Sequence, residues 1–259
     1  MSTGAPVVVH RDAPLLARAV AARLVTRLVD AQASRGTAHV VLTGGGIGTR
    51  VLAELAASPA RDAVDWARLH VWWGDERFVP ADSQERNEVG ARGALLDHVP
   101  LPPEHVHAVP AADGGARDVD EAAALYADEL ARHARSEDHA PVPQFDVLML
   151  GVGPDAHVAS LFPGQPALYE QERAVVGVRG APKPPPLRVS LTLPAIRAAR
   201  EVWLLAAGEE KAGAVGLALG GAGEVQVPAA GARGRRTLWL LDQAAAARLP
   251  RDLARPASP

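Results

Sequence analysis

The feature that most constrains this fold is a series of short apolar runs, each followed by a glycine-rich or polar loop and then by a helical pattern. The runs lie at residues 7–9, 38–43, 69–73, 145–150, 201–206 and 237–241, and they are rich in Val, Leu and Trp. Continuous apolar runs of this length are typical of strands buried on both faces of a parallel sheet. We therefore expect an α/β fold, with a mostly parallel sheet and helices on both of its faces.

The remaining segments indicate further helices and loops. Asp12 is placed to cap a first helix, in which apolar residues recur every three or four positions up to Gly36. We expect another strand at 188–192, and a last short helix capped by Asp242. Other helices are expected up to residue 57 and at 86–98, 119–135, 195–199 and 209–219. No internal repeat is evident, so we expect one domain over residues 1–249, followed by a frayed tail at 250–259.

Composition excludes several classes of function. The chain has 259 residues, of which 48% are hydrophobic, with no cysteine and a formal net charge of −3. Without cysteine there is no thiol catalysis, thiolate metal site or disulfide, and the near-neutral charge gives no footprint for nucleic acid. No apolar run is long enough to span a bilayer, and no signal peptide is recognisable. We expect a cytoplasmic protein, a monomer or weak homodimer, with a small-molecule partner and neither nucleic acid nor membrane.

Ligands of such sheets bind beyond the carboxyl ends of the strands, where the loops after the apolar runs meet. The first of these loops, Thr43-Gly44-Gly45-Gly46, allows backbone N–H groups to approach an anion at a helix N-terminus. It lacks the Lys-Ser or Lys-Thr pair of a P-loop, and Thr49 or Val51 takes the place of the third glycine in Gly-x-Gly-x-x-Gly. A small phosphate is therefore favoured over a dinucleotide, with a simple tight turn as the alternative.

Two further loops carry charged or titratable side chains. Asp75, Glu76 and Arg77 directly follow an apolar run, either as part of a site or as a solvated loop. Farther along the chain, Asp155 precedes His157 by two residues, which supplies a candidate base and a carboxylate to orient it. A structural or surface histidine is the alternative. No cluster has metal-ligand spacing in the sequence, so we expect no metal site.

Two cations complete the candidate site. Lys211 starts a helix, where the helix dipole does not favour a cation, and only Lys183 and Lys211 occur as lysines in this chain. A rare lysine in that place suggests contact with a ligand phosphate. A surface salt bridge with Glu209 or Glu210 is the alternative. Arg188, at the start of the expected strand 188–192, is the second cation.

These segments together resemble the 6-phosphogluconolactonase family, which shares its fold with the glucosamine-6-phosphate deaminases/isomerases. The segment ending Ala159-Ser160-Leu161-Phe162-Pro163-Gly164 is the most specific, because the deaminases continue into Asn-Glu-Pro there. Two departures are Ala156, where the family usually has Gly, and Gly46-Ile47-Gly48 in place of Ser-Thr-Pro. The matching segments are the glycine loop at 43–48, Trp73-Gly74-Asp75-Glu76-Arg77-Phe78-Val79-Pro80 with Asn87 beyond it, Gly151 to Gly164, Arg188-Val189-Ser190-Leu191-Thr192 and Gly208-Glu209-Glu210-Lys211-Ala212.

The resemblance implies a Rossmann-like three-layer fold of the glucosamine-6-phosphate isomerase type. It also implies hydrolysis of the δ-lactone of 6-phosphogluconate in the oxidative pentose phosphate pathway, without metal or cofactor. His157 would be the general base, Asp155 would hold its tautomer, and Arg77 would meet the developing oxyanion or the sugar acid. The phosphate is expected to bind Thr43, Gly44, Gly45, Arg188 and Lys211.

Two other functions fit parts of the pattern. A sugar-phosphate isomerase or deaminase on the same fold would use Asp75 as its proton-transferring base, and the Leu-Phe-Pro-Gly ending argues against it. A non-catalytic sugar-phosphate sensor would bind phosphate through the same loops without a base. The placement of His157 after Asp155 argues against that function.

Overall fold

The computed structural model describes residues 5–135, 140–250 and 253. Its centre is a six-stranded parallel sheet with the strand order β1-β9-β8-β5-β2-β3. Each apolar run singled out in the sequence contributes one strand, so the expected α/β fold with a mostly parallel sheet is confirmed. The strands are β1 (Val7–His10), β2 (Ala38–Leu42), β3 (Leu69–Trp73), β5 (Val147–Gly151), β8 (Glu201–Ala206) and β9 (Arg236–Asp242).

Burial on both faces explains why these strands appear in the sequence as continuous apolar runs. Trp72, Leu148 and Trp203 are fully buried, and every residue of β8 is buried. Successive side chains of a strand point to opposite faces, so a strand covered on both sides has no position that favours a polar residue.

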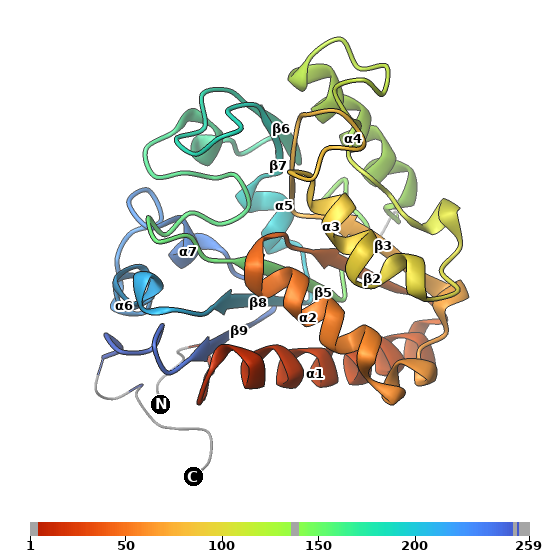
Figure 1. The fold of residues 1–259 in the computed structure, drawn as a ribbon. Helices are drawn as coiled ribbons and strands as arrows, with labels where there is room; N and C mark the ends of the chain where they lie inside the picture. Colours follow the sequence, from red (N-terminus) through yellow and green to blue (C-terminus); the bar gives the residue numbers. More distant parts are fainter. Residues whose placement is uncertain (1–4, 136–139, 251–252, 254–259) are drawn as a thin grey trace.

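Helices cover both faces of this sheet. In Figure 1, α1 (Ala13–Arg35) and α2 (Gly45–Ala57) lie in front of the sheet, and α5 (Leu193–Arg197) and α7 (Pro228–Gly231) lie behind it. Among the described residues, no helix is both long and apolar enough to cross a membrane. The other helices are α3 (Asn87–Ala94), α4 (Val119–His133) and α6 (Ala212–Leu219), with 3₁₀ turns η1 (Pro59–Ala63), η2 (Trp66–Arg68), η3 (Leu96–His98), η4 (Pro103–His105), η5 (Pro166–Tyr169) and η6 (Glu209–Lys211).

A second sheet of three antiparallel strands lies beyond the carboxyl end of β3. Its order is β4-β7-β6, formed by β4 (Asp75–Arg77), β7 (Arg188–Leu191) and β6 (Val175–Val178). The segment 75–77, interpreted in the sequence as a loop, is therefore a short strand, and the strand expected at 188–192 lies outside the main sheet. Charged residues conceal β4 in the sequence, because its strand conformation depends on pairing with the distant β7.

Two helices expected from the sequence differ in the structure: one is shorter than predicted and the other does not form. The helix expected at 86–98 ends at Ala94 and is followed by η3. The helix expected after Asp242 is wrong: the chain forms turns there, although Asp242 does cap them by accepting a hydrogen bond from the Ala245 N–H at 2.7 Å. Pro250 follows closely and leaves little room for a longer helix. The tail expected at 250–259 lies, apart from residues 250 and 253, outside the described residues.

The sheet changes its winding direction between β2 and β5. From β1 the chain crosses to β2 and then β3 toward one edge, whereas from β5 it crosses to β8 and then β9 toward the other edge. The segments that follow β2 and β5 therefore diverge, and a crevice forms at the carboxyl ends of these two neighbouring strands. The glycine loops at 43–46 and 151–153 meet in this crevice.

Candidate active site

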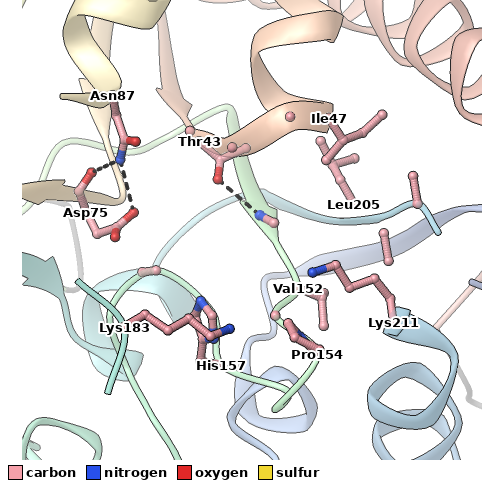
Figure 2. Close-up of a pocket in the computed structure, with 18 of the residues that line it drawn as sticks. Thr43, Ile47, Asp75, Asn87, Val152, Pro154, His157, Lys183, Leu205 and Lys211 are labelled. Atoms are coloured by element: carbon pink, nitrogen blue, oxygen red, sulfur yellow. Dashed lines mark hydrogen bonds between the residues drawn. The ribbon is translucent and has the colours of Figure 1, made fainter. Parts of the chain in front are cut away.

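A cavity of about 310 Å³ occupies this crevice. Figure 2 shows side chains from several parts of the chain around it: the β2–α2 loop, the β3–β4 region with α3, the loop after β5, the loop before β7 that carries Lys183, and the end of η6 with Lys211. All nine candidate site residues except Asp155 line the cavity, and Asp155 contacts a lining residue. The lining includes Thr43, Gly44, Gly45, Asp75, Arg77, Asn87, Gly153, His157, Lys183, Arg188 and Lys211.

The glycine loop presents the N-terminus of α2 to the cavity. Gly44 is the N-cap of α2 and offers no side chain to cap it, and Gly45 has a φ of 76°. A Cβ atom at Gly44 would lie 1.8 Å from Oδ1 of Asn87, so any other residue there would displace the Asn87 side chain. Thr43 joins the two loops, because its Oγ1 accepts a hydrogen bond from the Gly151 N–H at 3.1 Å. Uncapped N–H groups at a helix N-terminus favour an anion.

His157 and Asp155 form a close pair at the cavity wall. Nδ1 of His157 lies 2.5 Å from Oδ1 of Asp155. An ionised carboxylate only accepts hydrogen bonds, so the proton of neutral His157 is held on Nδ1 and the lone pair is on Nε2. A Cβ atom at Gly153 would lie 2.1 Å from Nδ1 of His157, so glycine is required there for the pair to form.

The charge of Asp155 is stabilised by its neighbours. Burial alone would raise the pKa of Asp155, but the hydrogen bond from His157 and the positive charges of His157 and Lys183 hold this pKa well below its ordinary value. The ammonium of Lys183 lies 3.3 Å from Oδ1 of Asp155. Asp155 therefore stays ionised throughout the pH range in which imidazoles titrate, and it can fix the orientation of His157 throughout that range.

Ala156, between these two residues, adopts a φ of 66°, which is the left-handed region that favours glycine. The backbone here is fixed by two hydrogen bonds: the Ala156 N–H donates to the Gly153 carbonyl at 2.9 Å, and the Ala229 N–H donates to the Ala156 carbonyl at 3.0 Å. The left-handed conformation costs an alanine about 1–2 kcal/mol.

We expect Ala156→Gly to stabilise the protein by up to about 1 kcal/mol, because relief of this strain exceeds the greater loss of chain entropy at glycine. As a matched control, Ala124→Gly on the exposed face of α4 should destabilise by about 1 kcal/mol. Urea denaturation of the three proteins measures both changes. A loss of stability in Ala156→Gly as large as that of the control would contradict the strain at this position.

Two arginines lie directly opposite each other in the second sheet. Arg77 of β4 pairs with Arg188 of β7 in the antiparallel register. Like charges in such positions repel, and among the described residues neither guanidinium forms an ion pair with a carboxylate. Arg188 is 5% exposed and donates to the carbonyls of Pro185 and Lys183 at 3.0 and 2.8 Å. Burial, together with the charge of Arg77, lowers the pKa of Arg188 despite the opposing effect of Asp75.

Asp75 lies in the cavity wall, but its oxygens already have partners. Its Oδ2 accepts a hydrogen bond from the Ser160 hydroxyl at 2.7 Å, and its Oδ1 lies 3.5 Å from the amide nitrogen of Asn87. The same Asn87 nitrogen donates to the Asp75 carbonyl at 2.8 Å (Figure 2). The segment that the sequence left open as a solvated loop is thus buried and held by hydrogen bonds.

Lys211 reaches into the cavity from the side opposite Asp75 and Asn87 (Figure 2). Its Nζ lies 3.9 Å from a carboxylate oxygen of Glu210, so the surface salt bridge considered from the sequence is at most a long one. Burial lowers the pKa of Lys211, ahead of the opposing charge of Glu210. A partly buried ammonium whose positive charge is so weakly balanced by a nearby carboxylate favours an anionic ligand.

Sequence reasoning did not assign three residues that complete the site. Lys183 comes from a proline-rich loop, and its only signal was the rarity of lysine in this chain. Asn87 was noted only as part of a matching motif. Glu76 lies outside the cavity lining but organises it: its buried carboxylate accepts hydrogen bonds from the N–H groups of Asn87 and Glu88, at 2.7 and 2.8 Å. Burial raises the pKa of Glu76 despite these bonds and the nearby charge of Arg86.

The sequence and the fold of this protein are similar to those of known proteins. A family described as glucosamine-6-phosphate isomerases/6-phosphogluconolactonase matches residues 11–239. A 6-phosphogluconolactonase of Streptomyces coelicolor is 66% identical over 100% of both chains, and one of Mycobacterium tuberculosis is 52% identical over 92% of this chain and 96% of the relative. The solved structure of 6-phosphogluconolactonase from Trypanosoma brucei superposes with a TM-score of 0.80 at 29% identity, covering 96% of this chain and 100% of that one. The chain therefore belongs to the glucosamine-6-phosphate isomerase/6-phosphogluconolactonase family.

Proposed function

We propose that this protein is a 6-phosphogluconolactonase, an ester hydrolase that converts 6-phospho-D-glucono-1,5-lactone to 6-phospho-D-gluconate. The observation that carries the proposal is that one cavity is lined by His157 of a His–Asp pair, by Lys211, and by Arg77 and Arg188, which form no ion pair with a carboxylate among the described residues. The pair supplies a base and the cations suit a phosphate and a developing oxyanion. The relatives named 6-phosphogluconolactonase support the same activity.

His157 acts as the general base in the proposed mechanism. A water molecule attacks the lactone carbonyl carbon while Nε2 of His157 takes one of its protons. The C–O bond to the ring oxygen then breaks, and the leaving oxygen receives the proton back from the imidazolium. Asp155 holds the other ring nitrogen and stabilises the imidazolium in between.

The cations position the substrate and stabilise charge. Lys211, Arg188 and the N-terminus of α2, with Thr43, Gly44 and Gly45, would hold the 6-phosphate at one end of the cavity. Arg77 would face the carbonyl oxygen as it becomes negative, because its guanidinium is a fixed cation with several donors. Fixing the phosphate orients the ring ester for attack, which contributes to the rate without any new chemistry.

An isomerase or deaminase is the competing function on this fold, and the local contacts of Asp75 disfavour it. That reaction needs Asp75 as a mobile proton acceptor, whereas its carboxylate is occupied by Ser160 and Asn87. The test is to supply the purified protein with the phospholactone and, separately, with glucosamine-6-phosphate. We expect acid release from the lactone and no ammonia from the amino sugar. Ammonia release without lactone hydrolysis would reverse the assignment.

We also expect that chelators will leave the catalytic rate unchanged, because no step of the proposed reaction uses a metal. Initial rates of lactone hydrolysis with and without EDTA, measured well below the melting temperature, check this expectation. Complete loss of activity with EDTA, followed by recovery on adding a divalent ion, would show that the metal-free mechanism is wrong.

A further inference from the structure

A cluster of histidines lies far from the proposed active site. His70 is in the first half of β3, whereas the active-site residues follow the carboxyl end of that strand. His107 follows η4, and His133 is the last residue of α4. One ring nitrogen from each lies within 4.8 Å of the other two. Their separation along the chain explains why metal-ligand spacing was not visible in the sequence.

Neighbouring groups orient these rings toward one another. Nδ1 of His107 lies 2.8 Å from Oε1 of Glu129, and Nδ1 of His133 lies 3.0 Å from the Glu129 carbonyl. Both oxygens can only accept, so both Nδ1 atoms carry protons and each Nε2 keeps its lone pair. Nδ1 of His70 lies 2.9 Å from Nε2 of His107. Histidine ligands of metals are held in this way, with the second ring nitrogen fixed by a carboxylate or carbonyl.

We propose that His70, His107 and His133 form a binding site for a divalent transition-metal ion, with Zn²⁺ as the expected occupant. Three imidazoles suit Zn²⁺, and tetrahedral Zn–N bonds of about 2.0–2.1 Å place the ligand nitrogens about 3.3 Å apart. The observed ring nitrogens, which lie within 4.8 Å of one another, would move closer together on binding. This proposal is independent of the proposed lactonase activity, because the ion would lie beside the first half of the edge strand β3, whereas the proposed active site lies beyond the carboxyl ends of β2 and β5.

The surroundings make the site rigid and accessible. The ring of His107 stacks on Trp72 with centroids 3.8 Å apart, and its backbone N–H donates to the Val71 carbonyl at 2.9 Å. His133, but neither His70 nor His107, also lines a separate cavity of about 210 Å³.

The role we infer is structural. A bound ion would add a further link between the edge strand β3, the segment after η4 and the end of α4, which already meet through the Val71–Val106 bridge and the hydrogen bonds of Tyr126 with Trp73. An ion that binds only the folded chain raises the melting temperature, by about 5–10 °C for a protein of this size at a hundredfold excess over the dissociation constant.

The test uses the full chain, stripped with a chelator and titrated with Zn²⁺ by calorimetry. We expect one high-affinity Zn²⁺ per chain and the rise in melting temperature. His133→Ala and His70→Asn should each weaken binding at least about 100-fold, and Glu129→Gln about 10–100-fold. His98→Ala, which removes an exposed histidine outside the cluster, should bind like the unaltered protein.

Two outcomes would overturn the proposal. If Zn²⁺ does not bind, the three rings form only a hydrogen-bonded chain. If His133→Ala and His70→Asn bind Zn²⁺ with the same affinity as the unaltered protein, the ion binds elsewhere. Lactone hydrolysis should be equal with and without Zn²⁺, so failure of this site is distinguishable from failure of the proposed enzymatic function.

Discussion

His157→Asn should lower kcat for lactone hydrolysis by about 10²–10⁴-fold, because general-base catalysis is typically worth that much. Asparagine keeps a polar side chain of similar size but cannot take up a proton at neutral pH. Binding of the product 6-phosphogluconate should change little, because the proposed phosphate contacts remain in place. Steady-state kinetics and product inhibition measure the two effects separately.

The pH dependence of the rate is a second test of His157 as the general base. Protonated His157 has no lone pair on Nε2, so the rate of the unaltered enzyme should fall over the pH range in which His157 takes up a proton. Asp155 does not produce this decrease, because hydrogen bonding and nearby positive charge hold its pKa well below that range. His157→Asn should lack this acid limb.

The matched control is His98→Asn, which alters an exposed histidine remote from the cavity and should keep full activity. If His157→Asn retains near-normal kcat, or keeps the acid limb unchanged, His157 is not the base. Asp75, which lines the same cavity, is then the next residue to test.

Gluconolactone without the phosphate should be a poor substrate, with kcat/KM lower by about 10²–10⁴-fold. The estimate follows from losing charge-assisted hydrogen bonds to Arg188 and Lys211, at about 1.5–3 kcal/mol each. Because the phosphate is remote from the reacting carbon, its binding energy both retains the substrate and places the ester for attack. Initial rates with the two lactones, each corrected for spontaneous hydrolysis, provide the ratio.

Lys211→Ala tests whether this preference arises where we place it. The variant should lose kcat/KM mainly for the phosphorylated lactone, so the ratio between the two substrates should shrink by about 10–100-fold. Lys183→Ala is the comparison, because the ammonium of Lys183 contacts Asp155 beside the base. Equal kcat/KM values for the two lactones in the unaltered protein would remove the phosphate assignment from Arg188 and Lys211.

The main sheet could be predicted from the sequence because its strands are buried on both faces. Burial of that kind favours apolar residues at every position of β8 after Glu201 and throughout residues 147–150 of β5, and the pattern is local. The same reasoning located the glycine loops, since the carboxyl ends of neighbouring parallel strands meet in space. The family resemblance then indicated which side chains in those loops carry the chemistry.

The features that the sequence did not predict depend on contacts between distant segments. Asp75 and Glu76 are charged and look solvated, yet Ser160, Asn87 and the backbone of α3 hold them in a buried strand. The pairing of Arg77 with Arg188 exists only because β4 and β7 are adjacent. The histidine cluster likewise requires β3, η4 and α4 to be brought together.

The most direct test of the proposed function is the rate at which 6-phosphogluconolactone disappears with the purified protein, measured against the same buffer without it. The lactone hydrolyses spontaneously, so the blank defines the reference rate. We predict a rate in excess of the blank that is proportional to protein concentration, saturates with substrate and yields 6-phosphogluconate. A rate equal to the blank at every protein concentration, from a protein that still binds 6-phosphogluconate, would contradict the assignment and leave a non-catalytic sugar-phosphate sensor.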